Sequence, residues 1–157
     1  LSGMSGTLQG VRRELRKNYR GGSKVLPTHR PLALTKRVTR VASDRSEQLQ
    51  WLVEQLLDCQ SKGRAVLIGT ASVARSLEVS AQLTASDIGH RLLNATTLAE
   101  ESAIISCAGE AGGITVATAM AGRGTDIKIS AEVRAAGGLE VILLDRHDLV
   151  RLSLIHI

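Results

Sequence analysis

The stretch AVLIGT at residues 65–70 decides which fold this sequence can adopt. It is apolar without interruption, which is typical of a strand buried on both faces of a parallel sheet. Gly63 stands just before it at a position suited to end a helix, and Ser72 follows it at a position suited to begin one. The sequence therefore predicts a central strand with helices packed around it.

Further strand-like and helical segments alternate on either side of this stretch. The strand-like segments are residues 37–42, 90–95, 114–118 and 139–145. Helical segments are residues 44–62, a segment that begins after Ser72, and a segment from Thr97 through Ala108. Alternation of this kind with short Gly turns predicts an α/β fold with three layers, α/β/α, around a parallel sheet.

The helical segments also indicate which of their faces are buried. In the first, the predicted inward face comprises Leu49, Leu52, Val53, Leu56 and Leu57, which recur at helical spacing. In the second, we expect the inward face to comprise Val73, Leu77, Ser80 and Ala81. Capping pairs are predicted for two of the helices, namely Asp44 with Glu47 and Thr97 with Glu100.

Composition narrows the class of protein. The net charge is +5 and arginines crowd the first 45 residues, which allows contact with anionic lipid or with phosphate groups. One Trp, one Tyr and no Phe leave little for base stacking, so nucleic acid is not an expected partner. We expect Cys59 and Cys107 to be free, buried thiols of a reducing compartment. No apolar run reaches the ~18 residues that a membrane span needs.

Residues 1–36 have a different character from the rest, with frequent Gly and Arg. Pro27 and Pro31 favour an extended connector here. The chain starts at Leu1 rather than Met and stops at Ile157 inside an apolar run. We therefore expect both ends to be cut from a longer protein.

The loop Gly122-Arg123-Gly124-Thr125-Asp126 is the richest candidate binding segment. Its glycines allow close approach of backbone to a ligand, and the Arg123 guanidinium suits a phosphate or a carboxylate. Ligands of parallel sheets bind beyond the carboxyl ends of the strands. That rule selects the loops at residues 69–72, 95–97, 119–126 and 145–148.

Catalytic and metal-binding signals are missing from the sequence. No GxxxxGK[ST] phosphate loop occurs, and the four His and two Cys show no metal-ligand spacing. We therefore predict neither a catalytic residue nor a metal ligand within these 157 residues.

Six segments in chain order carry a family resemblance. They are LSGMSGT at residues 1–7, LPTHRP at 26–31, VLIGT at 66–70 with Ser72 and Ser76, His90 with Leu93-Asn94-Ala95, TVATAMAGRGTDI at 115–127, and residues 137–139 with 146–147. Together they resemble the SecA preprotein translocase ATPase family. The chain departs from the family pattern at Thr96, Ala119, Leu143 and Leu144, so it resembles a divergent member.

The resemblance implies a RecA-like fold of the class shared by P-loop NTPases and superfamily 2 helicases, truncated at the C-terminus. It implies that residues 1–24 are the end of a first nucleotide-binding motor domain with its connector. Residues 25–151 are then an incomplete second motor domain, and residues 152–157 match nothing in the family and are expected to be a non-native tail. By the same resemblance, Asp126 contacts nucleotide and Arg123 lies in the same cleft, with Gly122, Gly124 and Thr125 beside them.

The resemblance also implies a function. The complete protein would be an ATP-driven translocase that moves preproteins through a SecYEG-type channel, at the cytoplasmic face of the bacterial inner membrane. ATP and Mg²⁺ would be bound largely by parts outside this chain, including the first motor domain, so the chain alone is expected to be inactive. Two alternatives stay open from the residues themselves: half of a superfamily 2 nucleic-acid helicase, and an inactive RecA-like binding module.

Overall fold

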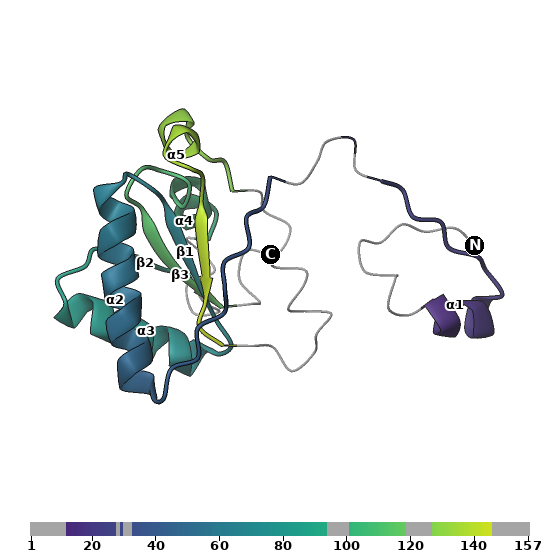
Figure 1. Cartoon of the computed structure of the whole chain (residues 1–157), viewed down its shortest axis with the longest axis horizontal. Coiled ribbons are helices and arrows are strands. Elements are labelled where there is room, and N and C mark those ends of the chain that lie inside the picture. Colours follow the sequence, from purple (N-terminus) through teal and green to yellow (C-terminus); the bar gives the residue numbers. More distant parts are fainter. Residues whose placement is uncertain (1–11, 28, 30–32, 94–100, 119–126, 146–157) are drawn as a thin grey trace. The chain divides into compact units, whose positions relative to one another are not determined.

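The computed structural model describes residues 12–27, 29, 33–93, 101–118 and 127–145 (Figure 1). The chain divides into two compact units. The larger unit spans Arg40–Arg146 and contains the sheet, and the smaller one includes the residues up to Thr39.

The smaller unit contains one described helix, α1 (Arg12–Tyr19), which has no buried residue. The prediction of an extended connector is wrong for these eight residues. Its residues are mostly good helix formers, and Glu14 in the first turn and Lys17 in the last complement the helix dipole. The prolines that suggested an extended chain lie downstream of this helix, and residues 20–27 form neither helix nor strand.

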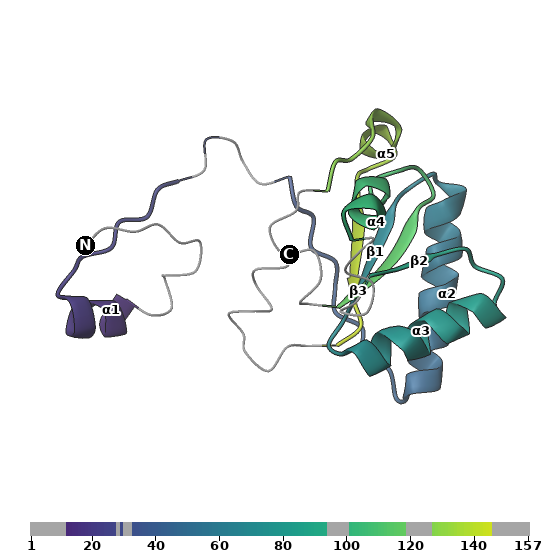
Figure 2. The ribbon, with the colours of Figure 1, turned by 180° about the vertical axis from the view of Figure 1, so that it is seen from behind.

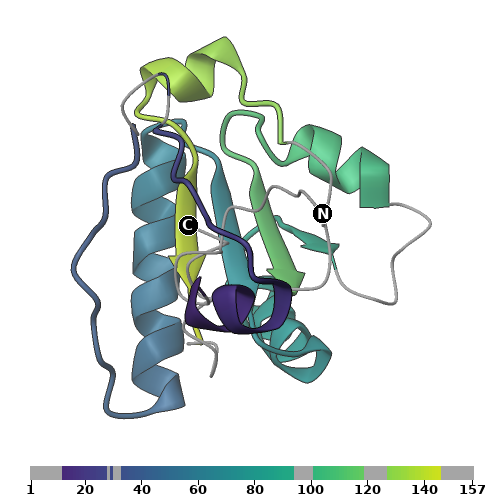
Figure 3. The ribbon, with the colours of Figure 1, turned by 90° about the vertical axis from the view of Figure 1, so that its right-hand side faces the viewer.

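The sheet of the larger unit has four parallel strands in the described residues (Figure 3). They are β1 (Val66–Thr70), β2 (Arg91–Leu93), β3 (Ile114–Thr118) and β4 (Glu140–Leu143), in the order β2-β3-β1-β4. Thr70 pairs with Thr118 and Gly69 with Leu143, so the carboxyl ends of β1, β3 and β4 are level. The strands predicted within residues 65–70, 90–95, 114–118 and 139–145 are thereby confirmed.

Helices cover both faces of this sheet. The helices α2 (Arg45–Ser61) and α3 (Val73–Ala85) lie on one side, and α4 (Glu101–Cys107) lies on the other (Figures 1 and 2). A short helix that the sequence did not predict, α5 (Ala131–Ala135), begins where the Ser130 hydroxyl accepts from the Val133 N–H at 3.2 Å. The three-layer α/β/α fold is confirmed.

The main core lies between the sheet and the α2–α3 layer. Val66 and Ile68 of β1 meet Leu52 and Leu56 of α2, and all four side chains are fully buried. On the opposite face of the sheet, Gly69 leaves room for a neighbour: a Cβ atom there would lie 2.5 Å from Leu143 Cδ2. The continuous apolar run of β1 therefore serves both faces, as a strand covered on both sides requires.

The predicted inward face of α2 is right except for Leu57, which is 53% exposed. Successive residues of a helix are separated by about 100°, so a residue next to one at the centre of the buried face points partly outward.

The predicted inward face of α3 is wrong. The buried residues are Arg75, Ser76, Val79 and Leu83, whereas Leu77 is exposed. Apolar residues alone suggested the other side of this helix. Its actual inward face carries an Arg and a Ser in the first turn, where polar partners at the end of the sheet are available.

The strand predicted at residues 37–42 does not form. Val38 is 97% exposed and Val41 is 88% exposed. A strand needs a neighbour to pair its backbone groups, and no described residue pairs with this segment in a sheet. Alternation of β-branched residues is a local property, and it carries no information about whether a neighbouring strand exists.

The capping prediction for α2 is confirmed. Asp44 Oδ1 accepts from the Glu47 N–H at 2.8 Å, and the Glu47 carboxylate in turn accepts from the Ser43 hydroxyl at 2.6 Å and the Ser43 N–H at 2.8 Å. These bonds from Ser43 lower the pKa of Glu47. Gly63, with φ of +66°, follows the last turn as predicted. The Thr97–Glu100 pair lies outside the described residues.

Both cysteines are free thiols, as predicted, but only Cys59 is buried. Cys107 stands at the last residue of α4 and is partly exposed. Among the residues that the structure describes, no helix is long and apolar enough to cross a membrane.

The neighbours Leu56 and Leu57 provide a test of the core. Leu56→Ala in the 157-residue chain should lower the free energy of unfolding by about 2–5 kcal/mol, because it leaves a cavity at a fully buried site. Leu57→Ala, at an exposed site, should change it by no more than about 0.5 kcal/mol. Urea unfolding measures both, and equal losses would mean that α2 packs on a different face.

Candidate functional site

The candidate site is the edge of the sheet at which its parallel strands end, here called the carboxyl edge. Thr70 ends β1 and Thr118 ends β3, and both are buried. The Thr70 hydroxyl donates to the Ala117 carbonyl at 3.2 Å, which ties the two strand ends together. A ligand of a parallel sheet binds beyond such an edge, where loops from different strands converge.

The loop predicted to bind a ligand lies outside the described residues. It contains all five predicted site residues: Gly122, Arg123, Gly124, Thr125 and Asp126. The structure describes the two segments that flank it, namely β3, which ends at Thr118, and residues 127–130. Among the other residues of the predicted edge, 95–97 and His147 also lie outside the described part.

The segment that follows this loop is held by the turn after α4. A Cβ atom on Gly109 would lie 2.1 Å from the Lys128 carbonyl oxygen, so the two backbones pass in direct contact. The Gly109 carbonyl also accepts from the Ser130 N–H at 3.1 Å. A side chain of any size at residue 109 would displace the backbone that leaves the loop.

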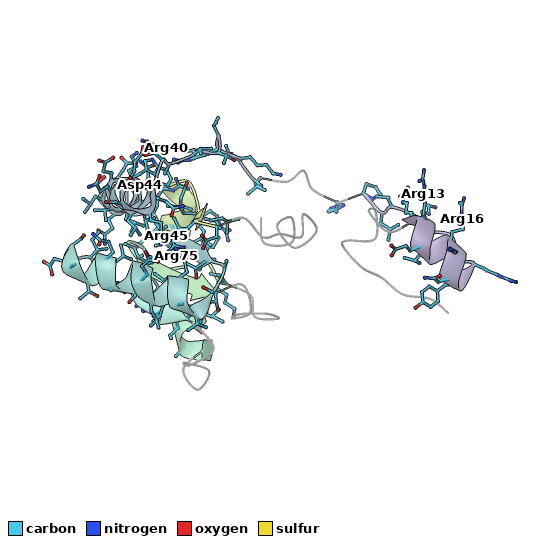
Figure 4. The ribbon with its side chains drawn as sticks, turned by 90° about the horizontal axis from the view of Figure 1, so that it is seen from below. Arg13, Arg16, Arg40, Asp44, Arg45 and Arg75 are labelled. Atoms are coloured by element: carbon cyan, nitrogen blue, oxygen red, sulfur yellow. The ribbon has the colours of Figure 1, made fainter. Side chains whose placement is uncertain are left out.

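Four polar side chains gather beside the ends of β1 and β4. This group, here called the edge cluster, comprises Gln48 of α2, Arg75 and Glu78 of α3, and Asp145 beyond β4. Figure 4 labels Arg75 together with Arg45 of the neighbouring helix. The cluster brings three segments of the chain together at the carboxyl edge.

The contacts of the edge cluster join side chains to backbone. Asp145 Oδ2 accepts from the Ala71 N–H at 3.1 Å, and Gln48 Nε2 donates to the Leu144 carbonyl at 2.7 Å. Arg75 Nη2 donates to Gln48 Oε1. The first residues beyond β1 and beyond β4 are therefore held by the same group of side chains.

Two arginines, Arg75 of the cluster and Arg45 beside it, contact Glu78. Glu78 Oε2 lies 2.7 Å from Arg75 Nη1 and 3.5 Å from Arg45 Nη1. The contact with Arg75, and to a lesser extent the charge of Arg45, lowers the pKa of Glu78. Glu78 is therefore ionised at neutral pH and stabilises the buried guanidinium beside it.

The loop at residues 145–148 was predicted to lie at the carboxyl edge, which includes Asp145, but Gln48 and Arg75 were not predicted to lie there. Arg75 lies on the inward stripe of α3 with Ser76 and Val79, and none of these three residues belongs to the face that was predicted for this helix. The sequence does indicate where this Arg lies along the helix. An Arg three residues after a helix-capping Ser is in the first turn, close to the end of the preceding strand. Burial of that Arg is a tertiary property, and no periodicity reports it.

His90 and its hydrogen-bonding partners lie away from the carboxyl edge. His90 Nδ1 lies 2.9 Å from the Ile88 carbonyl and His90 Nε2 lies 2.7 Å from Ser80 Oγ, at the start of β2 rather than at the carboxyl edge. In the described part of the chain, no group of His, Cys, Asp and Glu residues is arranged to hold a metal ion. These residues do not fit an Mg²⁺ site of their own.

The chain is similar in sequence to proteins of one family. Residues 34–135, more than half of the chain, match the family described as the SecA P-loop domain. The chain is 43% identical over 148 residues to protein translocase subunit SecA of Bacteroides fragilis, covering 94% of this chain and 13% of that protein. It is 40% identical over 153 residues to the subunits of the same name from Clostridium botulinum and Clostridium tetani, covering 98% of this chain and 18% of each relative.

The contact between Gly109 and Lys128 can be tested by adding one methyl group. Gly109→Ala should lower the thermal midpoint of the 157-residue chain, because the methyl group meets backbone that is itself part of the fold. We expect the free energy of unfolding to fall by roughly 1–3 kcal/mol. Gly89→Ala is the matched control, since a Cβ there has no atom within 4 Å. If both variants melt like the parent chain, the segments around Gly109 and Lys128 are not in contact.

Proposed function

The chain belongs to the SecA family, and from that membership we propose that it supplies the second face of an ATP site in a preprotein-translocating motor. The chain spans 13–18% of the length of the curated relatives that it matches. The activity, substrates and partners of the complete protein are therefore part of this proposal.

The arrangement of the carboxyl edge supports the proposal most directly. Three strand ends are level there, and the edge cluster anchors the segments that leave β1 and β4. An edge held in this way is a rigid platform against which a second domain can close on a nucleotide. The relatives, which are named protein translocase subunits, indicate what such closure would drive.

The proposed nucleotide contacts are the residues of the loop after β3. Asp126 accepts hydrogen bonds from the nucleotide or from an Arg of the closing partner, and Arg123 offers its guanidinium to phosphate. Gly122, Gly124 and Thr125 allow the backbone to come close. ATP would bring Mg²⁺ with it, and the ligands of that ion would come from parts of the protein outside this chain.

The domain limits and partners follow from the same proposal. Residues 1–24 end the first motor domain, residues 25–151 form part of the second, and residues 152–157 are a non-native tail. The partners would be that first domain, the preprotein and a SecYEG-type channel at the cytoplasmic face of the bacterial inner membrane, with anionic lipid as a further contact. No observation favours the nucleic-acid helicase or the inactive binding module.

The proposal predicts a specific loss of function in the full-length protein. Asp126→Asn, which is nearly isosteric, should lower preprotein-stimulated ATP hydrolysis by roughly 10- to 100-fold, because a charge-assisted contact is lost. The melting temperature should stay within about 2 °C of the parent. Turnover and melting are measured on the same preparation. A variant that melts early but keeps full activity per folded molecule would show that Asp126 serves only the fold.

The chain by itself should not hydrolyse ATP. Its sequence has no GxxxxGK[ST] phosphate loop, and in this proposal the ligands of the metal lie outside the chain. A phosphate-release assay on the purified 157-residue chain, with the full-length protein as the positive control, tests this expectation. Turnover by the chain that depends on Mg²⁺ and survives further purification would contradict it.

A further inference from the structure

We propose that Arg75 is a positioning residue for the nucleotide-facing edge. Its buried guanidinium, acting with Gln48 and Asp145, holds the chain that leaves β4 against the loop that follows β1. This inference rests on the proposed function, because that function puts the nucleotide at the carboxyl edge.

The burial of Arg75 is the first observation behind this proposal. Its side chain is only 7% exposed, although it lies in the first turn of a helix whose neighbouring inward residues are Ser76 and Val79. A buried guanidinium loses hydration and must recover it through partners. An apolar residue at this position would pack without losing hydration. Packing alone therefore does not explain why an Arg is buried here.

The second observation is the set of elements that Arg75 joins. Its Nη2 donates to Gln48 Oε1 of α2, and Gln48 Nε2 in turn donates to the Leu144 carbonyl at 2.7 Å. Its Nη1 lies 2.7 Å from Glu78, one turn further along α3. The guanidinium therefore connects both helices of one layer to the backbone at the end of β4.

Asp145 is the third element of the arrangement. Its Oδ2 accepts from the Ala71 N–H at 3.1 Å, and its Oδ1 lies 3.9 Å from Arg75 Nε. That second separation is an ion pair too long for a hydrogen bond. Arg75 Nε is buried and makes no hydrogen bond within the described part of the chain. Asp145 thus holds the loop after β1 directly and is itself held by the charge of Arg75.

These contacts join Ala71, just beyond β1, to Asp145, just beyond β4 and 74 positions later in the chain. Ligands of a parallel sheet bind at such positions. Loops that are already held in their binding position bind a ligand more tightly than loops that must be ordered on binding. A small loss of order at Ala71 and Asp145 is therefore expected to reach the nucleotide although neither Arg75 nor Gln48 needs to touch it.

The test uses the full-length protein with Arg75→Lys and Asp145→Asn. The Lys variant keeps the charge but loses the planar fork of donors, and the Asn variant keeps an acceptor for the Ala71 N–H but loses the charge. Arg45→Gln is the matched control, because Arg45 contacts the same Glu78 from a side chain that is 77% exposed. The measurements are the KM for ATP, kcat and the melting temperature.

We expect each variant to raise the KM for ATP by about tenfold with a smaller change in kcat, as for a loss of ground-state placement. The control should match the parent. The double variant should be no worse than the worse single variant, because both residues act in one unit.

Each of the following outcomes would overturn the inference. Variants that melt earlier but keep KM and kcat per folded molecule would make Arg75 a stability residue only. Single effects that multiply in the double variant would separate Arg75 from Asp145. An unchanged KM in an active enzyme overturns this inference alone, whereas a parent protein that neither binds nor hydrolyses ATP overturns the proposed function and the inference with it.

Discussion

Strand β1 pairs its backbone on both sides and buries Val66 and Ile68 fully on one face and Leu67 partly on the other, and the rest of the larger unit is arranged around that requirement. Its partners β3 and β4 lie in register with it, so their carboxyl ends finish at one level. Because all three strands are parallel, the chain must return over the sheet between them, which places helices on both faces. The same requirement therefore produces the layers, the core and the edge at which a ligand would bind.

The carboxyl edge is stabilised by polar contacts rather than by apolar packing alone. Arg75 and Gln48 connect two helices to backbone just beyond β4, and Asp145 accepts from the Ala71 N–H just beyond β1. Hydrogen bonds restrict direction as well as distance, whereas apolar contacts tolerate sliding. Under the proposed function, an edge with few alternative arrangements would help to transmit nucleotide binding to a neighbouring domain.

Much of this fold is predictable from the sequence, because buried parallel strands and capped amphipathic helices leave strong local patterns. The AVLIGT run and the Asp44–Glu47 cap are examples. The predictions were wrong where the outcome depends on a neighbour. Val38 and Val41 look like strand residues but pair with no strand in the described part of the chain, and Arg75 is buried by side chains distant in sequence. The predicted nucleotide loop rests on family resemblance, because its short Gly-rich pattern has too little periodicity to be informative by itself.

Gly69 and Gly109 of the larger unit differ in whether a substitution at a neighbouring residue could make room for a larger side chain. At Gly69, the atom that a new methyl group would meet is Cδ2 of Leu143, the tip of a side chain that is 42% exposed and can rotate toward solvent. At Gly109, the neighbour is the Lys128 carbonyl, which cannot move without its peptide unit. Position 69 should therefore covary with position 143 among related chains, each accepting bulk when the other gives it up. Position 109 has no such compensating partner, because no change of side chain at 128 alters the size of a carbonyl group.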